Sequence, residues 1–314
     1  MDKYEKKLYF YHPQQNTMHS HPAIQATVKV FDSIQSRWQS RSFMKILGTL
    51  LVVFYLLSLL MIELQRLGLL GSVFSFVPLS HFKSIELAFT LLLFFEVVEL
   101  VLSLEKSVSQ SMHIQLEILS LILLRSAFKV VGEFPEVITM DAIKEQVLYM
   151  FSDAFGALLI FFGVLIIKRF EKSLSICRTE DGLQSFVTIK KLLALLLLVI
   201  FLTMIVLDVI YFFMDVRVFD FFHSFYTILI FSDVLVVFIS LRYSDSYLVL
   251  FRNSGFALGT VIIRLALNAD PPFNAALGIA ATLFVMGLVY FYNKAYSDEM
   301  KNVKLPNKFT NKSR

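Results

Sequence analysis

Cysteine is nearly absent from this sequence. Cys177 is the only one among 314 residues, so neither an internal disulfide nor a metal site built from several cysteines can form. Charged residues are also scarce, at 17%, whereas a soluble domain carries about a quarter. A glycine-rich phosphate loop, an HExxH helix and a GxSxG turn are missing too. We therefore expect no enzyme activity, no cofactor and no metal site, and a net charge of +4 is too small to indicate nucleic-acid binding.

Apolar residues dominate the composition instead. They make up 57% of the chain, including 33 phenylalanines, and they form runs close to the roughly 20 residues that cross a bilayer as a helix. A membrane β-barrel would need short alternating strands, which these continuous runs do not provide. The sequence predicts an all-α polytopic membrane protein with eight transmembrane helices, at residues 44–63, 86–104, 113–131, 148–167, 191–213, 224–241, 251–268 and 275–292.

The second half of the chain repeats the first. Two pairs of segments carry the match. FTLLLFFEVVELVLSL (89–104) aligns without a gap with YTILIFSDVLVVFISL (226–241), and further on LILLRSAF (121–128) aligns with TVIIRLAL (260–267). The alignment places Glu96 on Asp233 and Arg125 on Arg264. Because each unit has an even number of helices, both units have the same orientation, and we predict two parallel four-helix repeats.

Lysine and arginine gather in the N-terminal segment, in the linker between the repeats and in the C-terminal tail. Such residues stay on the cytoplasmic side of a membrane, so we predict that both termini and the linker are cytoplasmic. The predicted parts are a cytoplasmic N-terminal segment (1–43), the first unit (44–168), a cytoplasmic linker (169–190), the second unit (191–293) and a basic tail (294–314).

Residues 23–43 have an amphipathic pattern, in which Ile24, Phe31 and Trp38 recur at helical spacing opposite basic residues. We interpret them as an interfacial helix on the inner leaflet. The alternative is a cytoplasmic extension of the first transmembrane helix. The partners expected from this pattern are the lipid bilayer and either an anionic lipid or a membrane protein bound by the basic helix and tail. The oligomeric state is not indicated.

Charged side chains within apolar helices are the candidate functional residues, because they are costly in lipid. At 1.5 Å per residue, Glu96 and Arg125 both lie roughly 15–18 Å from a membrane face. Asp233 and Arg264 repeat this placement in the second unit. We predict two intramembrane ion pairs, Glu96–Arg125 and Asp233–Arg264. Two readings stay open: each pair only orients its helices, or it lines a path for a proton, ion or ligand.

The first unit carries further acidic residues. Glu99 lies one helical turn from Glu96, and Glu117 is predicted at a similar depth in the next helix. Close carboxylates raise one another's pKa and can share a proton, so Glu96, Glu99 and Glu117 form a candidate ion or proton site. In the alternative, Glu117 faces the cytoplasmic interface. The second unit has Val236 opposite Glu99 and lacks this set.

These residues resemble a known family. An aromatic-acidic helix (LFFEVVELV and IFSDVLVVF), then a helix with arginine after two aliphatic residues (ILLRSAF and VIIRLAL), is similar to the phosphate-starvation-inducible PsiE family. In the second unit the likeness extends over FRNSGFALGTVIIRLALNAD, with Arg252 and Arg264 at family-like positions. In the first unit His113 stands where Arg252 does. The likeness covers residues 45–170 and 190–295.

The resemblance implies a tandem fusion of two four-helix units in a bacterial inner membrane, with a link to phosphate starvation or envelope stress and no implied reaction. Two other functions remain open: a secondary transporter or channel that moves protons or cations through the carboxylates, and an accessory subunit of a membrane complex.

Overall fold

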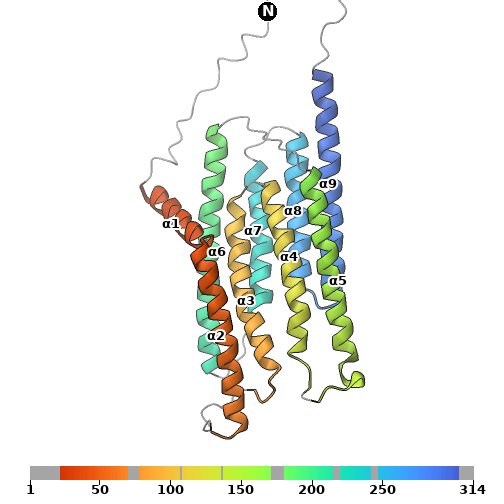
Figure 1. The fold of residues 1–314 in the computed structure, drawn as a ribbon. Coiled ribbons are helices and arrows are strands. Elements are labelled where there is room, and N and C mark those ends of the chain that lie inside the picture. The colour runs from red at the N-terminus through yellow and green to blue at the C-terminus, as the bar shows by residue number, and fades with distance from the viewer. Residues whose placement is uncertain are drawn as a thin grey trace, which may run out of the picture.

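The computed structural model describes residues 22–69, 78–106, 108–135, 137–170, 180–214, 220–241 and 247–303, and within them it is helical with no strand. Residues 1–21, residues 171–179 of the predicted linker and residues 304–314 of the predicted tail lie outside the described residues. The helices, shown in Figure 1, are α1 (Pro22–Trp38), α2 (Arg41–Arg66), α3 (Lys83–Leu102), the short 3-10 helix η3 (Ser103–Glu105), α4 (Val108–Val131), α5 (Met140–Phe170), α6 (Glu180–Phe213), α7 (Phe221–Leu241), α8 (Tyr247–Asn268) and α9 (Phe273–Val303).

Seven of the described helices are long and apolar enough to cross a membrane: α2, α3, α5, α6, α7, α8 and α9. Of the eight predicted transmembrane helices, seven therefore correspond to helices that could cross a membrane. The predicted span 113–131 falls within α4, which is long enough but carries more polar residues. Helix α4 contacts α3, α5, α8 and α9, which cover much of its surface, although Leu121, Leu124 and Phe128 stay exposed. A helix in that position keeps polar side chains at lower cost than one that faces hydrocarbon.

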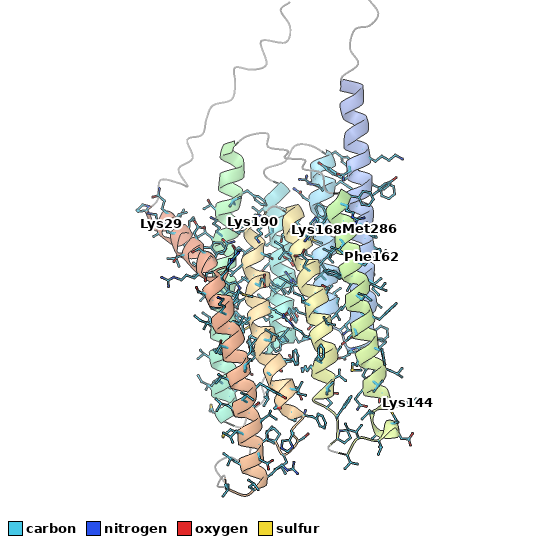
Figure 2. All side chains as sticks on the ribbon, viewed as in Figure 1. Lys29, Lys144, Phe162, Lys168, Lys190 and Met286 are labelled. Carbon is cyan, nitrogen blue, oxygen red and sulfur yellow. The ribbon has the colours of Figure 1, made fainter. Side chains whose placement is uncertain are left out.

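The bundle surface is apolar, as a lipid-facing surface must be. Phe162, Leu202 and Phe231 are among many large hydrophobic side chains that are more than half exposed. Charged side chains lie mainly toward the ends of the bundle. Lys29, Lys168 and Lys190 are toward the end at which α1 lies, and Lys144 is at the opposite end (Figure 2).

Two hydrophobic cores hold the helices together, and each combines both halves of the chain. One core joins α3, α6 and α7 and includes Leu100, Leu197 and Phe225. The other joins α4, α5, α8 and α9 and includes Leu119 and Ile160. Because neither half buries its own core alone, the two halves form one bundle.

Helix α1 is separate from α2. The break falls at Gln39 and Ser40, where the Ser40 side chain accepts a hydrogen bond from the Phe43 amide at 3.1 Å and so caps α2. The apolar face of α1 does not rest on lipid alone, because Phe31 is fully buried in the core with α6. Lys191 of α6 lies 5.9 Å from the Phe31 ring centroid and binds Asp32 at 2.5 Å. Helix α1 is thus fastened to the bundle.

Helices α5 and α9 pack in parallel at very close range. A Cβ atom on Gly156 would lie 2.6 Å from Ala275 Cβ, and one on Gly163 would lie 2.3 Å from Thr282 Cγ2. Near the start of α9, Asn274 Nδ2 donates to Asp153 Oδ1 at 2.8 Å, and both side chains are buried. Glycine and other small residues permit this approach of two membrane helices. The contact joins the last helix of each half.

Candidate functional site

The carboxylate of Asp233 and the guanidinium of Arg264 meet inside the bundle. Arg264 Nε donates to Asp233 Oδ2 at 3.2 Å, and the two side chains are 0% and 4% exposed. Asp233 lies on α7 and Arg264 on α8, which are neighbours in space. The remaining guanidinium nitrogens, Arg264 Nη1 and Nη2, have no hydrogen-bond partner among the described residues. The pair is therefore buried inside the bundle, and its guanidinium is incompletely satisfied.

Glu96 and Arg125 form the matching contact in the first half, as an ion pair between α3 and α4. The Glu96 side chain is 7% exposed, but that of Arg125 is 30% exposed. This pair is less enclosed than Asp233–Arg264. The cost of burying charge is lower for a guanidinium that reaches the surface.

Of the three predicted carboxylates, Glu96 and Glu117 each have a cationic partner, and Glu99 lies within electrostatic range of Glu117 and Lys106. Glu96 binds Arg125, Glu117 forms an ion pair with Lys168 of α5, and Glu99 is exposed. In the part of the chain that is described, no group of three histidine, cysteine, aspartate or glutamate residues is placed to hold a metal ion. Sequence reasoning missed Lys168, because its position at the end of a predicted helix marked it as a cytoplasmic charge.

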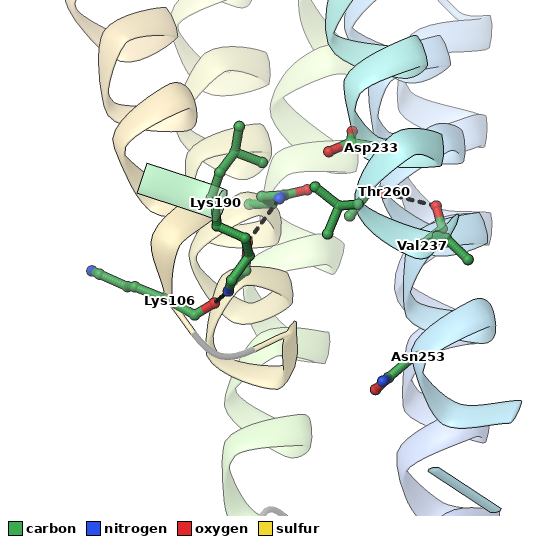
Figure 3. A pocket seen from close by; sticks show the side chains of 11 residues that line it. Lys106, Lys190, Asp233, Val237, Asn253 and Thr260 are labelled. Carbon is green, nitrogen blue, oxygen red and sulfur yellow. Dashed lines mark hydrogen bonds between the residues drawn. The ribbon is translucent and has the colours of Figure 1, made fainter. Parts of the chain in front are cut away.

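A small polar cavity lies beside Asp233 (Figure 3). Lys190 and Asp233 stand on opposite sides of it, and Thr260 lies next to Asp233. Lys190 is 3% exposed, and its Nζ donates to the carbonyl of Lys106. Gln115 of α4 also lines the cavity and is 1% exposed. Its side-chain nitrogen Nε2 donates to Ser111 Oγ at 3.0 Å.

Lys190 was placed in the cytoplasmic linker by the predicted boundaries 169–190. In the structure α6 begins at Glu180, and its apolar stretch begins at Phe186. Lys190 therefore lies one turn inside that stretch. Its neighbour Lys191 also lies 3.6 Å from Glu105 of η3, to which Gln35 of α1 donates at 2.6 Å. The polar groups around η3 thus connect α1, α6 and the cavity.

The apolar helices and the charged pairs inside the bundle define a class, the multi-pass α-helical membrane protein. Comparison of the chain with protein-family models, with curated proteins and with solved structures finds no match.

Proposed function

We propose that this chain is a non-enzymatic, PsiE-like protein of a bacterial inner membrane that acts in phosphate-starvation or envelope-stress physiology, with both termini in the cytoplasm. The observation that carries the proposal is the pair of Arg–carboxylate contacts, Glu96–Arg125 and Asp233–Arg264. They lie at matched sequence positions, between the second and third membrane helices of each proposed unit. These are also the residues on which the resemblance depends.

The order of helix contacts supports two parallel four-helix repeats. Successive helices touch in the first half, α2 with α3, α3 with α4 and α4 with α5. The same order holds from α6 to α9. The two terminal helices of the proposed units, α5 and α9, run parallel against each other, as two equivalent helices do around an axis normal to the membrane. The ion pairs then fix the second and third helices of each unit.

A growth experiment tests the physiological part. The transcript is expected to rise when phosphate becomes limiting, and deletion of the gene is expected to slow growth under that limitation but not in rich medium. A copy that encodes the wild-type protein should restore growth, and one that encodes Arg264→Leu should not. An unchanged transcript together with normal growth of the deletion strain would contradict the proposal.

One observation favours the second candidate, movement of protons or cations. Glu99 has no ion-pair partner among the described residues, although Glu96 and Glu117 each have one. It lies about 9 Å along the helix from Glu105, at 1.5 Å per residue. A carboxylate that lies this far inside an apolar membrane helix needs a proton, a cation or a partner group to compensate its charge. A partner protein would supply the same compensation, which is the accessory-subunit alternative.

Replacement of Glu99 by glutamine distinguishes these cases. If Glu99 carries ions, Glu99→Gln should leave folded yield and melting temperature nearly unchanged and abolish a proton or cation flux in reconstituted vesicles. Val236 holds the corresponding place in the second unit, so Val236→Gln serves as the matched control. Wild-type vesicles that show no flux above empty liposomes, across several cations and pH gradients, would remove transport as a candidate.

A further inference from the structure

The cavity beside Asp233 contains unmet hydrogen-bonding groups of both kinds. Lys190 Nζ has three donor hydrogens, and the Lys106 carbonyl accepts from one. No carboxylate of the described residues lies within ion-pair distance of this buried ammonium. On the other side Gln115 Oε1, also buried, accepts no hydrogen bond from the described part of the chain. The single hydroxyl hydrogen of Thr260 is shared between the Ala257 carbonyl, at 2.7 Å, and Asp233, so it is not free for a ligand.

These unmet groups define which ligand fits. An anion would accept from Lys190 but would face the oxygens of Gln115 and Asp233. A cation would suit those oxygens but would face the Lys190 ammonium. A water molecule accepts from Lys190 and donates to Gln115 or Asp233, so it satisfies both sides.

The size of the cavity agrees with this choice. About 40 Å³ is open to the centres of water-sized molecules, and a single water needs roughly 10–15 Å³ of such space. The cavity is partly open, and its lining includes Lys106, which follows η3 at the end of the bundle where α1 lies. Water can therefore enter from that end.

We propose that this cavity is a hydrated site in which water molecules bridge Lys190 to Gln115 and Asp233, and that it opens the Asp233–Arg264 pair to the side of the membrane at which α1 lies. The site makes one buried ion pair reachable by small hydrophilic solutes. This inference does not depend on the proposed physiological function, because it concerns access to the pair and not growth or flux.

Cysteine accessibility tests the site, since a thiol reacts as the thiolate and ionises readily only where water reaches it. Cys177→Ser provides a thiol-free background. Thr260→Cys and Asn253→Cys place reporters on the cavity wall. Leu258→Cys, on the same helix but on its outer face, and Ile263→Cys, in the fully buried core, are matched controls. Silver ion is added to oriented vesicles that contain the variant. The protein is then denatured and labelled with a fluorescent maleimide, and loss of label measures how much of the thiol had reacted with silver.

The two cavity cysteines are expected to react about tenfold faster than both controls. An apolar environment raises the pKa of a thiol, and each unit by which the pKa rises lowers the reactive thiolate fraction tenfold. The two cavity cysteines should react when silver is added on the side at which α1 lies and not when it is added on the other side. Equal rates for Thr260→Cys and Ile263→Cys would overturn the hydrated site, and reaction from the opposite side would overturn its sidedness. Adding Gln115→Leu should slow Thr260→Cys, and an unchanged rate would exclude Gln115 as the partner of the water.

Discussion

Replacing Arg264 by leucine is expected to reduce the amount of folded protein sharply. The change leaves Asp233, whose side chain is 4% exposed, without its cation inside the bundle. Loss of one partner of a buried ion pair typically costs on the order of 3–5 kcal/mol. The measurement is the yield of monodisperse protein in mild detergent, followed by the free energy of unfolding of the variants that remain folded.

Removing both charges should recover much of this loss. The double variant Arg264→Leu, Asp233→Leu leaves no buried unpaired charge, and a coupling energy of about 1–3 kcal/mol is expected from the double-mutant cycle. The first-half pair is the matched control. Arg125→Leu should cost less than Arg264→Leu, because the Arg125 side chain is already 30% exposed. Strictly additive losses at Asp233 and Arg264 would show that the pair contributes no coupling to stability.

The pairing of these charges could be predicted from the sequence, for a simple physical reason. Charged residues are so few within the apolar runs that helix rise alone brings Glu96 to the level of Arg125, and Asp233 to that of Arg264. The helices themselves could be predicted from the length of the continuous apolar runs. Helix α4 is the exception, because it carries more polar residues than the seven helices that could cross a membrane. Composition reports how polar a helix is, and it does not report which helices surround it.

The partners of Lys168 and Lys190 could not be predicted in this way. Both residues lie close to the end of an apolar run, where a lysine counts as cytoplasmic by linear position. Their long side chains instead reach a carboxylate on α4 and a carbonyl after η3, which depends on how distant helices pack. The amphipathic pattern of α1 predicted an apolar face resting on lipid, and it did not predict that Phe31 would pack against α6.

The contact between α5 and α9 should be the next most sensitive part of the fold. Gly163→Ala adds a methyl group 2.3 Å from Thr282 Cγ2. Thr282 cannot easily turn away, because its Oγ1 donates to the Gly278 carbonyl at 2.8 Å. The helices must therefore separate, and overpacking of this kind costs about 1–3 kcal/mol. Gly163→Leu should cost more and should lower the melting temperature in detergent further.

Gly287 on α9 offers the matched control, because a Cβ atom there meets nothing within 4 Å. Gly287→Ala should be neutral or stabilise the protein by up to about 1 kcal/mol, since alanine has the higher helix propensity. The two alanine variants add the same atom to a membrane helix and differ only in what it meets, so their comparison separates packing from propensity. If Gly163→Ala melts at the same temperature as Gly287→Ala, the close approach of α5 and α9 contributes nothing to stability. If instead only Gly163→Ala is destabilised, the parallel contact between the last helices of the two halves is part of what holds the bundle together.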